Sequence, residues 1–205
     1  MAEPPSRKIK PGEGWAGGAE QGVADSVDLG IGNICQPLMR IPIFVSAPTV
    51  LSKAQEAVRR HIQREVERMG LEQRALGRSD YPTELPLREV VTIARHCAGG
   101  IILGFSQFRA SAGVWKPETP QAEAFGEPVY FPSPWNQIEA GVLSSLGLPL
   151  LVFKEKGISG GVFDHGVSDV FIHPMPSVSA CRKEQNALRA VFLKWQTSVR
   201  NQYYR

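Results

Sequence analysis

Glu139 is the residue whose sequence surroundings best suit chemistry. It lies in residues 133–141, inside a stretch where apolar residues recur at helical spacing. A carboxylate on an apolar helix face is costly to bury, so its pKa should rise unless a partner or a ligand compensates. Perturbed acids of this kind are candidates for catalysis. At about 100° per residue, the apolar stripe that includes Glu139 consists of Trp135, Ile138, Val142, Leu143 and Leu146.

Two structural roles remain open for Glu139. It could be an acid whose charge is satisfied by its neighbours, or it could interact favourably with the helix dipole. If Pro134 is the first helical residue, Glu139 lies beyond the first turn, where the dipole effect has largely faded. The position therefore favours a functional role.

The elements that must position this helix alternate between strands and helices. Such alternation predicts an α/β fold with a mostly parallel sheet of about five strands, right-handed crossovers and helices on both faces. Ligands in such sheets bind beyond the carboxyl ends of the strands. The expected strands are 41–46, 71–76, 101–105, 148–153 and 169–173, and the expected helices are 51–69, about 87–94 with cap residues at 80–83, 134–146 and 179–203.

Residues 107–132 interrupt this alternation with a connection longer than is usual. They carry several aromatic residues. Two interpretations stay open: an ordered flap against a pocket, or a plain hairpin extension. These aromatic residues include Trp115, Phe125, Tyr130 and Phe131.

Length and composition predict one domain, residues 39–205, that follows a flexible tail, residues 1–38. The chain has 205 residues, and its first part is rich in Gly, Pro, Glu, Lys and Ser without periodicity. A net charge of +3, spread over several predicted helices, does not indicate nucleic-acid binding. The sequence shows neither a membrane-spanning run nor a signal peptide, so we expect a cytoplasmic protein without membrane contact.

Metal and disulfide chemistry are not expected. Cys35, Cys97 and Cys181 are far apart, and none has a Cys-x-x-Cys partner. His61, His96 and His173 also lack the spaced partners of a metal site. The three thiols are therefore interpreted as reduced and structural.

Two loops add candidate ligand contacts. Residues 46–49 end the first predicted strand, where backbone amides and the next helix N-terminus could hold a phosphate or a ribose. Asp164 and His165 lie in a glycine-rich loop after the strand at 148–153. They could contact a substrate, although Asp-His-Gly is also ordinary turn chemistry.

The pattern formed by Ser133, Trp135 and Glu139 is Ser-x-Trp-x-x-x-Glu, which resembles the catalytic segment of Toll/interleukin-1 receptor (TIR) domains. The first strand, with 44–46, resembles the TIR opening strand. Glu139-Ala140-Gly141 is also similar to the Glu-x-Gly of nucleoside 2-deoxyribosyltransferases. The resemblance spans residues 40–155 and implies a flavodoxin-like three-layer sandwich.

The resemblance implies that Glu139 is the catalytic carboxylate of an N-glycosidase acting on NAD. Nicotinamide leaves with its positive charge neutralised, so little acid catalysis is needed and one dominant carboxylate suffices. NAD is then a substrate, and no cofactor is expected. The implied substrate-binding residues are Ser46, Ala47, Pro48, Phe105, Ser106, Trp135, Asn136, Asp164 and His165.

The same resemblance implies a homo-oligomer and a role in bacterial antiviral defence. It also leaves two alternatives open. One is a transferase or N-glycosidase acting on nucleosides or nucleotides. The other is a non-catalytic TIR-type module that senses a nucleotide or binds a partner protein.

Overall fold

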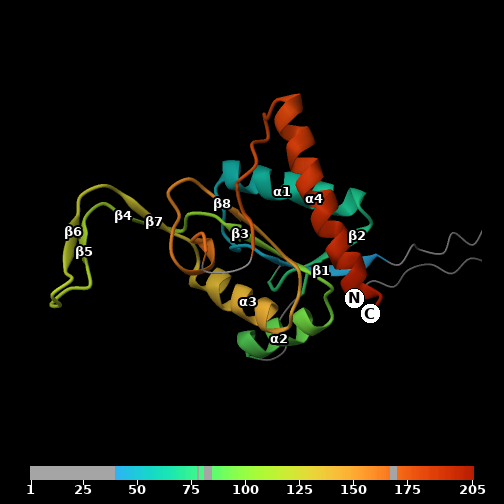
Figure 1. Cartoon of the computed structure of the whole chain (residues 1–205), viewed down its shortest axis with the longest axis horizontal. Helices are drawn as coiled ribbons and strands as arrows, with labels where there is room; N and C mark the ends of the chain where they lie inside the picture. Colours follow the sequence, from blue (N-terminus) through green and yellow to red (C-terminus); the bar gives the residue numbers. More distant parts are fainter. Residues whose placement is uncertain (1–39, 78, 81–84, 167–169) are drawn as a thin grey trace, which may run out of the picture. The chain divides into compact units, whose positions relative to one another are not determined.

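The computed structural model describes residues 40–77, 79–80, 85–166 and 170–205 (Figure 1). These residues belong to one compact unit, Pro37–Arg205. The predicted tail, 1–38, lies outside the described residues, as do Tyr81, Pro82 and Thr83 of the predicted helix cap and Asp169 of the last predicted strand. The division into a tail and a domain therefore stays a prediction.

The centre of the domain is a five-stranded sheet in the order β2-β1-β3-β8-β9. Every pair of neighbouring strands in it is parallel. The prediction of a mostly parallel five-stranded sheet is confirmed. The strands are β1 (Ile41–Ser46), β2 (Leu71–Arg74), β3 (Gly100–Gly104), β8 (Leu150–Lys154) and β9 (Ile172–Pro174).

Helices cover both faces of the sheet and complete a three-layer α/β sandwich (Figure 1). On one face, α1 and α4 contribute Ile62, Val66, Phe192 and Trp195 to a core that includes Ile43 of β1. On the other face, α2 and α3 pack against the opposite side of the same strands. Side chains alternate between the two cores because successive strand residues point to opposite faces. The helices are α1 (Lys53–Arg68), α2 (Pro86–Arg95), α3 (Pro134–Ser145) and α4 (Arg182–Tyr203).

The predicted cap of α2 is wrong for Asp80. The helix begins at Pro86, its N-cap residue is Leu85, and no side chain caps it. Asp80 instead accepts a hydrogen bond from Arg74 Nε at 2.9 Å. Its carboxylate is therefore committed to the end of β2, a tertiary contact that local sequence does not reveal.

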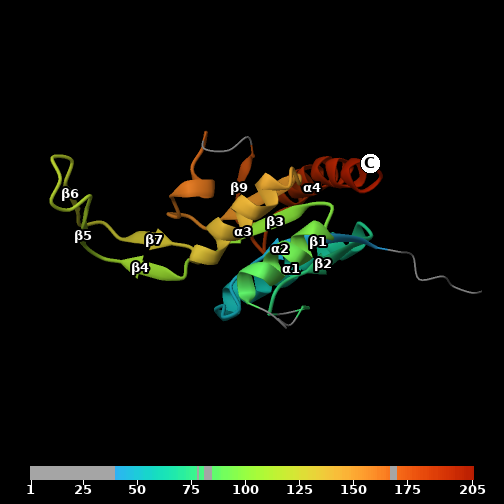
Figure 2. The same cartoon turned by 90° about the horizontal axis from the view of Figure 1, so that it is seen from below.

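Residues 107–132 form a hairpin arm that extends away from the sheet, the second of the two interpretations (Figures 1 and 2). Trp115 packs against Phe125 and Phe131, with ring centroids 5.4 and 5.9 Å apart. These three rings of the arm thus form a cluster of their own, whereas Tyr130 packs against the core on the α2 and α3 side. Its antiparallel pairs are β4 (Phe108–Ala110) with β7 (Val129–Phe131), and β5 (Gly113–Trp115) with β6 (Glu123–Phe125).

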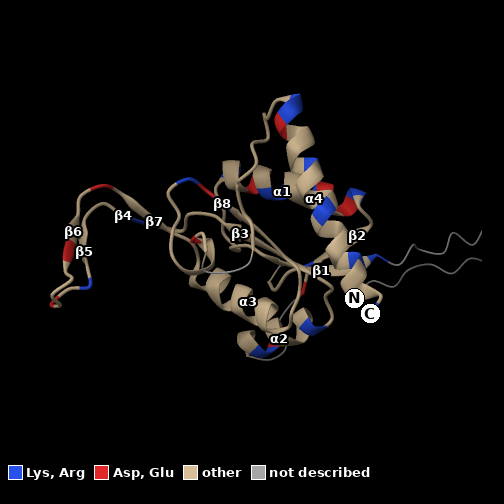
Figure 3. Cartoon of the chain, in the orientation of Figure 1, with Lys and Arg blue, Asp and Glu red and all other residues tan. Residues whose placement is uncertain are grey.

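Acidic and basic residues intermingle on the outer helices (Figure 3). On α1, Glu56 forms ion pairs with both Arg59 and Arg60. Helix α3 differs, because Glu139 is its only charged residue. Within the described part of the chain, no helix combines the length and the apolar character needed to cross a membrane.

Close packing of β3 against the loop after β8 predicts that Gly104 tolerates no side chain. A Cβ atom on Gly104 would clash with the ring of Phe163, which is fully buried. We expect Gly104→Ala to lower the free energy of unfolding by about 1–3 kcal/mol, measured by urea denaturation. Gly141→Ala is the control, because a Cβ atom there meets nothing within 4 Å and should stabilise α3 slightly. Equal stability of the two variants would contradict this account of the packing.

Candidate active site

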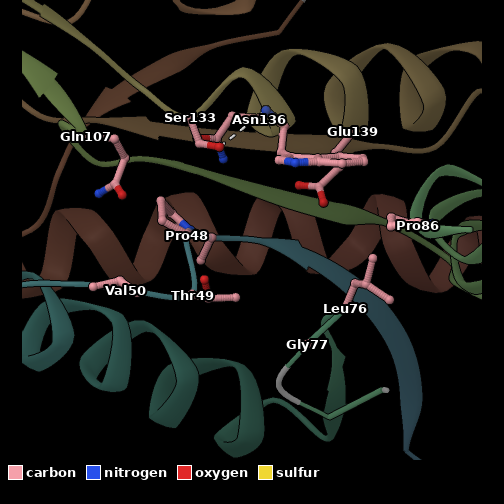
Figure 4. A pocket seen from close by; sticks show the side chains of 12 residues that line it. Pro48, Thr49, Val50, Leu76, Gly77, Pro86, Gln107, Ser133, Asn136 and Glu139 are labelled. Carbon is pink, nitrogen blue, oxygen red and sulfur yellow. Dashed lines mark hydrogen bonds between the residues drawn. The ribbon is translucent and has the colours of Figure 1, made fainter. Parts of the chain in front are cut away.

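A cavity of about 420 Å³ lies beyond the carboxyl ends of β1, β2 and β3 (Figure 4). Its volume lies within the range of small-molecule sites. The chain passes from β1 to β2 in one direction and then crosses back to β3, so the cavity is at the point where the strand order reverses. It is lined by Ala47, Pro48, Thr49, Val50, Leu76, Gly77, Pro86, Gln107, Ser133, Trp135, Asn136 and Glu139.

Helix α3 delivers the functional groups of this cavity. Ser133 is its N-cap residue and accepts a hydrogen bond from the Trp135 backbone N–H, and Pro134 provides the first helical position. Glu139 follows on the second turn, and its side chain points from the helix into the cavity (Figure 4). The start of α3 therefore sets how far Glu139 reaches into the space beyond the strands.

Glu139 is buried, with 8% of its surface exposed. Desolvation raises the pKa of its carboxyl from 4.5 to about 7, and the Ser46 hydroxyl acts in the opposite direction. No charged group contributes to this shift. The burial and raised pKa expected of Glu139 are confirmed, whereas its catalytic role stays a prediction.

The predicted apolar stripe of α3 is partly wrong. The buried residues are Asn136, Glu139, Ala140 and Leu143, whereas Trp135 and Ile138 are 41% and 43% exposed. The helix is rotated because the small Ala140 packs against the sheet and Asn136 forms hydrogen bonds there. These contacts outweigh the simple preference for apolar residues on the inner face.

Asn136 links α3 to two strands. Its Nδ2 donates to Ser46 Oγ at 2.7 Å and to the Leu103 carbonyl at 3.5 Å. Asn136 and Ser46 are each only 1% exposed. The Oδ1 atom of Asn136 is buried and has no hydrogen-bond partner among the described residues. A polar contact between residues 90 positions apart gives no signal in the sequence.

The cavity brings together several of the residues named from the sequence. Ala47, Pro48, Trp135 and Asn136 line it with Glu139, and Ser46 contacts Asn136 from the end of β1. The sequence did not indicate the contributions of the β2 end, of the start of α2 and of Gln107 after β3. Applying the rule of strand carboxyl ends to the weak strand at 71–76 would have pointed to two of these residues. The missed lining residues are Val50, Leu76, Gly77, Pro86 and Gln107.

Phe105 and Ser106 do not line the cavity. Phe105 is completely buried in the core on the α1 and α4 side of the sheet, the opposite side from α3. The Ser106 backbone N–H donates to Glu155 Oε2 at 2.7 Å. Both residues hold the end of β3 in place, and neither lines the cavity around Glu139. A contact with a substrate stays a prediction for Ser106, whereas the burial of Phe105 on the far side of the sheet speaks against one.

Asp164 and His165 also lie elsewhere. Asp164 Oδ1 accepts a hydrogen bond from the Gly160 backbone N–H at 2.7 Å, as in ordinary turn chemistry. His165 lines a different cavity, next to the ends of β8 and β9. No residue of the described part of this loop, 157–166, lines the cavity around Glu139.

The N-terminus of α1, expected to hold a phosphate or a ribose, is occupied by its own capping box. Ser52 Oγ accepts from the Gln55 backbone N–H at 3.2 Å, and Gln55 Oε1 accepts from the Ser52 backbone N–H at 3.1 Å. The helix starts that line the cavity are those of α3, through Ser133, Trp135 and Asn136, and of α2, through Pro86. No residue of α1 lines the cavity around Glu139, so the expectation for this helix start stays a prediction.

Glu139 is the only titratable side chain among the described residues that line the cavity. Across residues 40–77, 79–80, 85–166 and 170–205, no three His, Cys, Asp or Glu side chains converge as metal ligands would. The chemistry available in the cavity, as lined by the described residues, is thus that of one perturbed carboxylate beside neutral polar and apolar groups.

Comparisons with known proteins leave the family open. No protein-family model matches the chain, and no curated protein matches it. Among solved structures, the chain is similar to "Clostridium botulinum CMP N-glycosidase, BcmB", at a TM-score of 0.44 and 15% identity, over 74% of this chain and 98% of that chain. A likeness at this level decides nothing about function. The TIR and deoxyribosyltransferase resemblance stays a prediction.

The buried carboxylate predicts an unusual dependence of stability on pH. The folded protein holds a proton on Glu139 up to about pH 7, whereas the unfolded chain releases it near 4.5, so stability falls as pH rises through this window. Between pH 4 and pH 8, wild type should lose on the order of 3 kcal/mol that Glu139→Gln retains. Urea denaturation across this range measures the difference. Parallel curves for the two proteins would refute the raised pKa.

Proposed function

We propose that this chain is an N-glycosidase that cleaves the bond between a ribose and its base, with Glu139 as the catalytic carboxylate. One observation carries the proposal: a single buried carboxylate with a pKa of about 7 points into a cavity at the strand-order reversal of a parallel sheet. Ligands of such sheets bind at this position, and perturbed acids there are candidates for catalysis.

The chemistry of the bond suits one carboxylate. As the bond between C1′ and the base nitrogen breaks, its electron pair goes to the base and positive charge develops on the ribose. The ionised Glu139 carboxylate can stabilise that oxocarbenium ion or attack C1′ as a nucleophile. Water then adds its oxygen to C1′ and releases a proton, which completes hydrolysis.

NAD is the substrate that this arrangement favours. Its nicotinamide ring is cationic while bonded to the ribose and becomes neutral on leaving, so no acid must protonate it. The described lining offers no second titratable group to act as such an acid. A cationic ring beside Glu139 would also favour the ionised carboxylate, because an opposite charge lowers the pKa of an acid.

Neutral side chains complete the proposed binding surface. Trp135 lines the cavity from the first turn of α3, and Pro48 and Leu76 line it from the loops after β1 and β2. An aromatic ring with an exposed face can stack on a planar base. These residues would hold the base and the ribose while Glu139 acts at C1′.

The direct test incubates purified protein with NAD and measures nicotinamide release. We expect turnover by wild type and a loss on the order of a hundredfold to a thousandfold in Glu139→Gln, which keeps the shape of the side chain but cannot ionise. Glu123→Gln is the matched control, because Glu123 is an exposed acid of the arm. Deoxynucleosides and a nucleoside monophosphate are assayed in parallel. Cleavage of these substrates and not of NAD would favour the nucleoside or nucleotide alternative. No turnover of any substrate would refute both enzyme proposals and favour the non-catalytic module.

The proposed role also predicts a pH profile. If the ionised carboxylate is the active form, kcat/KM for NAD should rise with pH through about 7, where Glu139 loses its proton, and then level off. Residual activity of Glu139→Gln should show no such rise. A rate that falls through the same pH range would mean that the protonated acid is the active form and would contradict the mechanism.

A further inference from the structure

Two buried polar residues lie next to Glu139 without contributing a charge. Ser46 ends β1, and Asn136 lies one turn before Glu139 on α3. Both are 1% exposed, and their side chains are joined by a hydrogen bond of 2.7 Å. Buried polar groups in a well-packed region lower stability unless their hydrogen bonds are satisfied, so their arrangement calls for an explanation.

The Leu103 carbonyl determines which way the Asn136 amide faces. This carbonyl can only accept, so the amide atom near it must be the Nδ2 donor, which lies 3.5 Å away. Turning the amide over would place two acceptor oxygens against each other. The Nδ2 group therefore also faces Ser46, and Ser46 Oγ is the acceptor of that bond.

With its oxygen accepting from Asn136, the Ser46 hydroxyl keeps one proton to donate. Glu139 lies one helical turn after Asn136, and the Ser46 hydroxyl lowers the pKa of its carboxyl, as a donor to the carboxylate does. The observed bond from the amide to the hydroxyl therefore leaves the hydroxyl proton available for the carboxylate.

We propose that Asn136 and Ser46 are positioning residues that form a hydrogen-bond relay, from the Asn136 amide through the Ser46 hydroxyl to the Glu139 carboxylate. The relay holds the ionised carboxylate toward the cavity. Its importance for catalysis rests on the proposed function, but the relay itself does not. Asn136 acts on Glu139 only through Ser46, because it fixes the direction of the hydroxyl proton.

The energetics of the site agree with such a relay. Burial favours the protonated form of Glu139, and the donated hydrogen bond from Ser46 favours the ionised form. No other titratable side chain of the described lining, on β1, α2, α3 or the connecting loops, faces Glu139. The unpartnered Oδ1 of Asn136 lowers stability, and a position kept at such a cost is typical of functional sites.

The test measures the pKa of Glu139 in the unliganded protein, by ¹³C NMR titration of its side-chain carboxyl carbon. We expect Ser46→Ala to raise this pKa by about one unit, a tenfold change in the dissociation constant, because a donor to the carboxylate is lost. Asn136→Leu, which has nearly the same shape, should raise it by less. The double variant should match Ser46→Ala alone, because Asn136 has no effect once Ser46 is gone.

Ser145→Ala is the control, since Ser145 is an exposed residue of α3 that donates to the Val142 carbonyl. It should leave the titration unchanged. An unchanged pKa in Ser46→Ala would overturn the relay, and so would additive shifts in the double variant. If Ser46→Ala or Asn136→Leu fails to fold by circular dichroism, Ser46→Cys and Asn136→Ala replace them with the same expectations, because a thiol is a weak donor.

The titration separates the relay from the proposed function. It needs no substrate, so a protein that cleaves nothing still shows whether Ser46 and Asn136 control Glu139. The opposite outcome is also possible. If Glu139→Gln abolishes nicotinamide release but Ser46→Ala leaves the pKa of Glu139 unchanged, the N-glycosidase proposal stands and the relay is refuted.

Discussion

The loss of water around one carboxylate is the constraint on which the candidate site depends. Glu139 lies on the face of α3 that packs against the sheet, and burial raises its pKa to about 7. Nothing charged in the described lining offsets this cost. A neutral hydroxyl, Ser46, opposes it in part, so the carboxylate stays poised between its two protonation states near neutral pH. A positive charge that enters the cavity would shift this balance toward the ionised form.

The topology of the sheet explains why these groups meet. The strand order β2-β1-β3-β8-β9 reverses direction between β1 and β3, which leaves a crevice beyond their carboxyl ends. Ser46 ends β1, Leu103 lies on β3, and Asn136 of α3 binds both. The helix is thus anchored over the crevice by hydrogen bonds to the two strands that form it. The other polar residues near these strand ends, such as Ser106 and Glu155, hold the strands together.

The candidate site could be predicted from sequence only as far as local pattern reaches. Periodicity placed Glu139 on a helix that follows Ser133, and the apolar runs placed the strands whose ends surround it. Phe105 ends the predicted strand at 101–105, and His165 lies in the loop after the strand at 148–153. Position along the chain does not say toward which face a side chain points. Phe105 points into the core on the far side of the sheet, and His165 lines another cavity.

The sequence by itself determined the alternation of strands and helices, since hydrophobic periodicity depends only on local spacing. It also determined that an acid would lie among apolar residues of one helix. Only the tertiary structure decided the rotation of α3, the burial of Asn136 instead of Trp135, and the hydrogen bond between Asn136 and Ser46. The physical reason is that these features depend on contacts between residues far apart in the chain. The packing of α3 on the sheet decides which residues contact each other, and the pattern of either segment alone does not.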